Sequence, residues 1–309
     1  MPTSKPLPTV DGQGIIDMHV HVGPELLPRR YSPTDLAREA RREGIGVVMK
    51  NHFQSTTGFA SMLAREDPSV PLIGSVVLNL ACGGIDEHGI RAALSGWKRD
   101  VTARDPDADR FVVWMPTVCA EGHLRVMGRY DLPPEWGIKE EHARYFEEGE
   151  GLTIVGHGGE PIAGLGRVFK AVADLDLVLA SGHLDRTETK LFARLAHEAG
   201  LRRVVLTHPL FQATELEPDE LKDLWRDYGA YTELAFVNMA MDKLTARQYA
   251  DVIRAVGAEG CILSSDLGQP FSPPVGDGWR LYLDLLRGEG ISEDEIVRMA
   301  VVNPRALLL

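Results

Sequence analysis

Two histidines, His19 and His21, are separated by one residue in the apolar run "IIDMHVHV" at residues 15–22. The length and β-rich composition of this run predict a buried strand. Because side chains alternate along a strand, Asp17, His19 and His21 share one face. Imidazole is the commonest metal ligand, but a neutral imidazole can also be satisfied by hydrogen bonds in a polar pocket. The run leaves both interpretations open, a metal site or hydrogen-bonded core histidines.

Side chains that could do chemistry recur where later apolar runs end. Such runs end in Lys50 and His52 (45–52), His183 (177–183), His208 (202–209), Glu233 (230–236) and Asp266 (261–268). Four imidazoles and a carboxylate supply nitrogen and oxygen ligands that suit zinc, and the same ligands also bind manganese, iron, nickel or cobalt. A catalytic metal activates water, and Asp266 is placed to accept its proton. We expect one or two divalent ions bound by His19, His21, His183, His208 and Asp266.

Helical patterns separate these strands. The predicted helices are 32–46, 56–67, 86–97, 164–176, 188–200, 218–229, 245–257 and 277–290. Two further strands, 71–80 and 110–117, complete eight strand–helix units. Continuous apolar strands alternating with helices indicate a parallel sheet, and eight units favour a closed (β/α)₈ TIM barrel. The C-terminal strand ends of such a barrel open on one face, where distant residues meet. We therefore predict a single α/β domain over residues 1–309.

One segment, residues 118–160, interrupts this alternation between the fourth strand and its helix. Connections this long are uncommon in compact domains and usually form lids or binding loops, although an inert excursion is the alternative. Because it follows the C-terminal end of a strand, we expect a lid or pocket wall over the barrel mouth. His123 and His157 belong to this insertion. The remaining histidines, His88, His142 and His197, lie in polar helix or loop contexts and are expected to face solvent.

Composition limits the classes of protein that fit. The 309 residues are 44% hydrophobic and 25% charged, and the net charge is −12, without a cluster of Lys and Arg on a candidate helix. This argues against a nucleic-acid or anionic-membrane surface and leaves a small molecule as the expected partner. Three widely spaced cysteines predict no disulfide framework and no thiolate zinc site. Without an apolar signal core or a run of about eighteen apolar residues, a cytoplasmic location is expected. Homo-oligomerisation is left open.

The order of these motifs resembles the amidohydrolase superfamily of metal-dependent hydrolases. The matching residues are His19-x-His21, His183, His208 and Asp266, together with "NPRALL" at 303–308. The resemblance implies that His19, His21 and Asp266 hold one metal. It also implies that His183 and His208 either hold a second metal or supply one ligand and one group facing the substrate.

This sequence departs from the common two-metal pattern at the fourth strand. The segment "RFVVWMPT" lacks the lysine or glutamate that usually bridges the metals, and Thr117 cannot replace it. Lys50 offers an alternative, since a carboxylated Lys50 would supply a bridging carbamate. A cationic Lys50 could instead bind a substrate carboxylate, or its ammonium could simply reach solvent at the rim. We favour a functional Lys50.

Three functions are consistent with these residues. The first is a hydrolase in which metal-activated water attacks an amide, lactone or related ester bond, with Asp266 as general base and acid. The second is a single-metal decarboxylase of aromatic acids, and the third is a noncatalytic metal-binding barrel. The predicted catalytic residues are Asp266, His208 and Lys50, and the predicted substrate-binding residues are His52, Arg29, Arg30, Glu233 and His157.

Overall fold

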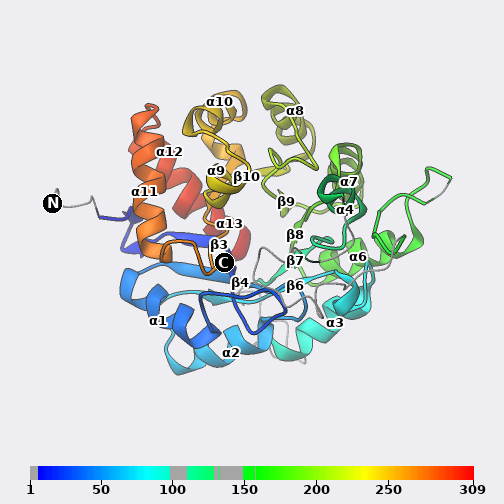
Figure 1. The fold of residues 1–309 in the computed structure, drawn as a ribbon, viewed down its shortest axis with the longest axis horizontal. Helices are drawn as coiled ribbons and strands as arrows, with labels where there is room; N and C mark the ends of the chain where they lie inside the picture. Colours follow the sequence, from blue (N-terminus) through cyan, green and yellow to red (C-terminus); the bar gives the residue numbers. More distant parts are fainter. Residues whose placement is uncertain (1–5, 98–109, 129–131, 133–148, 157) are drawn as a thin grey trace.

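The computed structural model describes residues 6–97, 110–128, 132, 149–156 and 158–309 (Figure 1). Strands and helices alternate along the chain, as the sequence predicts. The strands are β1 (Thr9–Val10), β2 (Gln13–Gly14), β3 (Ile16–His21), β4 (Gly46–Lys50), β5 (Leu72–Ile73), β6 (Ser75–Val77), β7 (Val112–Trp114), β8 (Val178–Ala180), β9 (Val204–Leu206), β10 (Tyr231–Ala235) and β11 (Cys261–Ser264).

The helices surround the strands in Figure 1. Up to the last strand and the helix after it, they are α1 (Pro33–Glu43), α2 (Thr57–Glu66), α3 (Glu87–Gly96), α4 (Glu121–Met127), α6 (Ala163–Asp174), α7 (Arg186–Glu198), α8 (Pro218–Tyr228), α9 (Val237–Met241), α10 (Ala246–Val256) and α11 (Val275–Gly288). The chain ends with α12 (Glu293–Val297), the π-helical turn η4 (Arg298–Val302) and α13 (Asn303–Leu308). Short 3-10 turns are η1 (Leu80–Cys82) and η3 (Ala258–Gly260).

Parallel pairing organises the strands into two main sheets, with orders β3-β4-β5 and β11-β10-β9-β8-β7-β6. The predicted strand 71–80 is divided at Gly74 into β5, which pairs with β4, and β6, which pairs with β7. A Cβ on Gly74 would lie 2.4 Å from Thr57 Cα, so only glycine allows α2 to pack this closely. At the other edge, Asp266 N donates to His19 O (2.8 Å) and His21 N donates to Leu267 O (2.7 Å).

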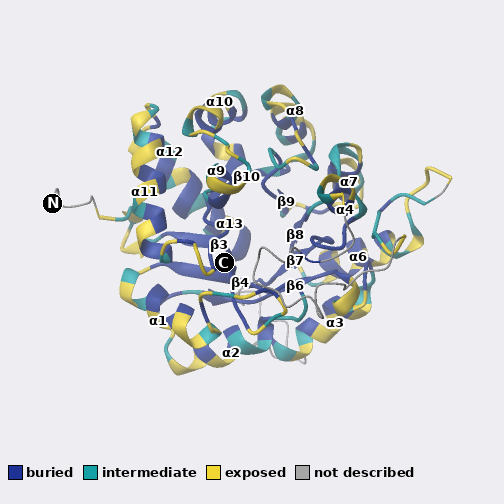
Figure 2. Cartoon of the chain, in the orientation of Figure 1, coloured by how far each residue is buried: buried dark blue, intermediate teal, exposed yellow. Residues whose placement is uncertain are grey.

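Helix α1 shows how the local sequence sets the covering layer. Ser32 caps its N-terminus by accepting a hydrogen bond from Asp35 N, and Gly44 ends it in the left-handed conformation (φ 68°). The spacing of Leu36, Ala37 and Ala40 places these side chains on one buried stripe. Figure 2 shows the same division throughout, with buried residues along the strands and exposed residues on the outer helix surfaces.

The α/β class and the parallel arrangement are confirmed, whereas the predicted single domain and the lid role of 118–160 stay predictions. Within that insertion, residues 129–131, 133–148 and 157 lie outside the described residues. No helix in the described chain is long and apolar enough to cross a membrane. Cys82, Cys119 and Cys261 are free cysteines.

Candidate metal centre and its pocket

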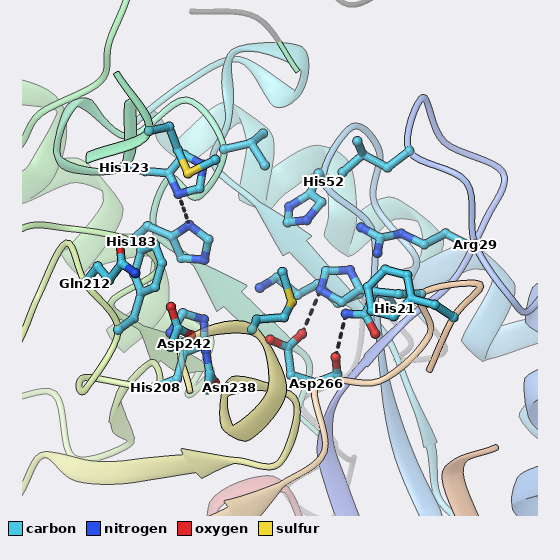
Figure 3. A pocket seen from close by; sticks show the side chains of 18 of the residues that line it. His21, Arg29, His52, His123, His183, His208, Gln212, Asn238, Asp242 and Asp266 are labelled. Atoms are coloured by element: carbon cyan, nitrogen blue, oxygen red, sulfur yellow. Dashed lines mark hydrogen bonds and ion pairs between the residues drawn. The ribbon is translucent and has the colours of Figure 1, made fainter. Parts of the chain in front are cut away.

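His19, His21 and Asp266 bring three potential metal ligands together where β3 ends and the chain leaves β11. Figure 3 shows His21 and Asp266 of this group. His19 Nε2 and His21 Nε2 lie 3.0 Å and 2.9 Å from Asp266 Oδ1. Oδ1 is buried, yet neither contact has the geometry of a hydrogen bond. Although burial alone would raise the pKa of Asp266, the adjacent imidazoles hold it well below its usual range, so the carboxylate is ionised. Three converging donors fit a catalytic divalent cation, since such sites keep a fourth position for water or substrate.

The backbone around this cluster is fixed by Asp17. Asp17 Oδ1 accepts hydrogen bonds from Ser265 N (3.0 Å) and His19 N (3.2 Å), and Oδ2 accepts from Trp279 Nε1 (2.8 Å). Asp17 thus ties β3 to the end of β11 and to α11, and it is not itself a member of the cluster. Asp266 has a left-handed backbone (φ 51°), a strained conformation of the kind that accumulates at functional sites.

Glu233, predicted to bind substrate, lies instead behind His19. Its side chain is completely buried, and Oε1 lies 3.1 Å from His19 Nδ1. A carboxylate can only accept, so Nδ1 donates to Glu233, and Nε2 is the nitrogen of His19 that faces the cluster. Oε2 accepts a hydrogen bond from His208 N (3.0 Å), and Ser264 Oγ donates to Oε1 (2.7 Å). We therefore correct the sequence-based role: Glu233 does not line the neighbouring cavity and both of its oxygens are already engaged, so it positions His19 and does not contact substrate.

Replacing Glu233 with glutamine is expected to weaken metal binding about 10- to 100-fold, the usual effect of losing a carboxylate partner of a ligating histidine. The measurement is a competition titration of zinc against a chromophoric chelator. Glu39→Gln is the matched control, because Glu39 on α1 is also buried but accepts a hydrogen bond from Tyr31 and contacts none of the cluster imidazoles. Equal zinc affinities of Glu233→Gln and the wild type would exclude the positioning role.

Lys50 lies inside the site and not at a solvent-facing rim. Its side chain is fully buried, Nζ is 2.9 Å from His19 Nε2, and Nζ lies 4.1 Å from the centroid of the Trp114 ring. Burial lowers the pKa of Lys50 to about 8. Trp114 also packs on His19, with ring centroids 4.6 Å apart. The fourth predicted strand therefore contributes the Trp114 ring, which packs against both Lys50 and His19.

A second group of possible ligands consists of His21, Glu25 and His52. The Glu25 carboxylate is already used: Oε1 pairs with Arg29 Nε, and Oε2 accepts from His52 N at 2.7 Å. His52 Nδ1 is 2.9 Å from Thr117 Oγ1. The positive charge of the Arg29 guanidinium disfavours binding of a metal ion by this group. We therefore interpret the group as a scaffold that orders one wall of the pocket.

His183 and His208 lie beside the cluster but are not among the residues whose ligand atoms converge within 4.8 Å. The His208 ring stacks on His19 with centroids 6.0 Å apart, and its buried Nδ1 has no hydrogen-bond partner among the described residues. His183 Nδ1 lies 3.0 Å from Nδ1 of His123, the insertion histidine on α4 that the sequence left undecided. Burial lowers the pKa of both His123 and His208 to about 4, so both rings are neutral.

These groups open into a cavity of about 260 Å³. Of the predicted substrate-binding residues, Arg29 and His52 line it, whereas Arg30 does not line it and donates to Pro270 O. His157 lies outside the described residues. Residues that the sequence analysis did not assign also line the cavity: Leu27, Val118, Met127, Phe211, Gln212, Asn238, Met241, Asp242, Gln269 and Phe271. Their only signal in the sequence is their position in segments that follow strands.

The fold matches solved structures of low sequence identity. An amidohydrolase from Burkholderia multivorans with bound zinc has a TM-score of 0.55 at 12% identity, covering 95% of this chain and 98% of that chain. A 2,6-dihydroxybenzoate decarboxylase from Rhizobium has a TM-score of 0.53 at 14% identity (96% and 98% covered). A probable 2-pyrone-4,6-dicarboxylic acid hydrolase from Acinetobacter baumannii has a TM-score of 0.53 at 10% identity (95% and 98% covered). The expected resemblance to the amidohydrolase superfamily is thereby confirmed at the level of the fold.

Sequence comparison identifies a family without a described activity. The profile described as "Family of unknown function (DUF6282)" matches residues 14–233. No curated protein sequence matches the chain. Neither the fold nor the family assigns a reaction, so the chemistry has to follow from the residues of the site.

Proposed function

This chain belongs to the family of unknown function DUF6282, and we propose that it is a metal-dependent hydrolase of a small molecule. One observation carries the proposal. Three ligand atoms from His19, His21 and Asp266 converge at the C-terminal ends of parallel strands, and two of these residues, His21 and Asp266, line a cavity large enough for a small compound. The hydrogen bonds from Asp266 N and His21 N across the sheet edge support the further proposal that the strands close into one (β/α)₈ barrel, whose active sites lie on this face.

A divalent cation at this cluster, with zinc as first choice, supplies Lewis-acid activation of water and of a substrate carbonyl. The chain's own residues do the rest. Asp266, whose side chain is 11% exposed and lines the cavity, accepts the proton of the attacking water and returns it to the leaving nitrogen or oxygen. Hydrolysis thus adds H and OH across an amide, lactone or ester bond. His208 and Lys50 face the same cavity and can donate hydrogen bonds to oxygens of the substrate.

Decarboxylation of a small acid is the second candidate, and the surroundings of Trp114 favour it. In the described chain, Trp114 beside Lys50 supplies no bridging carboxylate, and Glu25 of the second ligand group is already paired with Arg29, which leaves the His19, His21 and Asp266 cluster for a metal. A carbamate on Lys50 would restore a bridge and favour two metals and hydrolysis. Nuclear magnetic resonance with isotope-labelled bicarbonate distinguishes a carboxylated Lys50 from a free amine.

The proposal is tested by metal content and turnover in one preparation. We expect the purified protein to hold at least one zinc or similar ion per chain. Metal-loaded protein is then screened against lactones, esters, amides and aromatic acids, with released acid and carbon dioxide monitored separately. Treatment with EDTA should reduce any turnover to background, and added zinc should restore it. Hydrolytic products support the hydrolase, carbon dioxide supports the decarboxylase, and activity that survives complete metal removal contradicts both.

A further inference from the structure

Arg29 presents unused hydrogen-bond donors to the cavity. It follows β3, lines the cavity, and has only 6% of its side chain exposed. Nε is paired with Glu25, but no hydrogen bond within the described chain involves Nη1 or Nη2. A guanidinium has five N–H donors, and burying a charged group without partners is costly. The two terminal nitrogens are therefore available to a ligand inside the cavity (Figure 3).

The position of this guanidinium is fixed before any ligand arrives. The Glu25 side chain is fully buried and joins Arg29 to the backbone N–H of His52. Asn51 Nδ2 donates to Val22 O and to Pro24 O, both at 3.0 Å, which ties the loop to the end of β4. A preorganised donor pair loses less entropy on binding than a flexible one.

The chemistry of the cavity selects the kind of ligand. A planar guanidinium matches a carboxylate, which accepts two parallel hydrogen bonds. Arg29 and Lys50 supply two positive charges, and Glu25, Asp242 and Asp266 supply three negative ones, so a divalent cation at the cluster would leave one positive charge, which a single negative charge matches better than a dianion. Apolar side chains make up much of the rest of the lining, beside the amides of Gln212, Asn238 and Gln269: Leu27, Val118, Met127, Phe211, Met241 and Phe271. At about 260 Å³ the cavity suits a compound of about one ring.

We propose that the substrate is a small monocarboxylate with an apolar, ring-sized body, and that Arg29 binds its carboxylate through Nη1 and Nη2. This inference adds a substrate class to the proposed function. It rests on that function for one point, that the reacting bond of the substrate lies at the His19, His21 and Asp266 cluster. Arg29 is the specificity-determining residue.

Binding of benzoate and its neutral isostere benzamide tests the inference without requiring turnover. Isothermal titration of the protein as purified should show benzoate binding at least about 10-fold more tightly than benzamide. Arg29→Met should weaken benzoate binding about 10- to 100-fold, the size expected for hydrogen bonds to a charged group, and leave benzamide binding nearly unchanged. Arg42→Met is the matched control, because Arg42 Nε also pairs with a glutamate, Glu43, but its side chain is 63% exposed on α1.

Arg29→Met leaves Glu25 buried without its partner, so Glu25→Gln/Arg29→Met is made in parallel to remove both charges. Circular dichroism and thermal unfolding identify which variant folds as the wild type does. The benzoate affinity of that folded variant is the result that tests the role of Arg29. Absence of benzoate binding to the wild type, equal binding of benzamide, or wild-type benzoate affinity in the folded variant would each overturn the inference. Repeating the titration after EDTA treatment separates the two proposals. Arg29-dependent binding by a chain that never holds metal would contradict the proposed function alone, whereas a metal-dependent enzyme indifferent to Arg29 would contradict the inference alone.

Discussion

His19→Ala is expected to purify without its metal and to lose all metal-dependent turnover. His19 supplies one of only three converging ligand atoms, and its ring is held by Glu233 from behind and by Trp114 from the side. Alanine can neither ligate nor fill this position. Because loss of an outer carboxylate partner typically costs 10- to 100-fold in metal affinity, loss of the ligand itself should cost more than about 100-fold.

The measurement is elemental analysis of the variant and the wild type purified side by side. His88→Ala serves as the control, since the His88 side chain is 83% exposed and pairs only with Asp86 at the start of α3. Circular dichroism reports whether His19→Ala remains folded, and His19→Gln, which fills more of the space, is the second variant. A folded His19 variant that keeps the full wild-type metal content would refute the proposed centre.

Asp266→Asn is expected to lower turnover about 10²- to 10⁴-fold, the range for loss of a general acid–base group. An amide oxygen can still ligate a cation, but the amide cannot accept the proton of the attacking water. Asparagine also tolerates the left-handed backbone that Asp266 adopts, so the substitution tests chemistry and not backbone strain. The metal affinity of Asp266→Asn should fall less than that of His19→Ala, because the amide oxygen at position 266 can still serve as a ligand.

Steady-state kinetics on the substrate found by screening, together with metal content, provide this measurement. Asp242→Asn is a demanding control, since Asp242 lines the same cavity but its Oδ2 accepts from Asn238 Nδ2 at 2.5 Å and contacts no imidazole of the cluster. We expect the turnover of Asp242→Asn to fall by less than about 10-fold. Equal losses in the two variants would mean that charge in the cavity, and not proton transfer by Asp266, limits the rate.

The close agreement between expected and observed elements has a simple cause. Continuous apolar strands and capped amphipathic helices are encoded within a few residues, as Ser32 and Gly44 of α1 illustrate. The one divided strand, at Gly74, could not be foreseen. Its break depends on the close packing of α2 against β5 and β6, which is a contact between distant parts of the chain.

For the site, the sequence determined which chemical groups stand at the strand ends, because alternation along β3 and the common direction of parallel strands follow from local geometry. Only the tertiary structure decided their roles. It placed Glu233 behind His19, turned Lys50 into the cluster, joined His123 to His183, and left Arg29 with two unused nitrogens beside Glu25. Each of these roles depends on distances between atoms on different elements, and such distances are set by how the strands and loops pack, which no local pattern in the chain encodes.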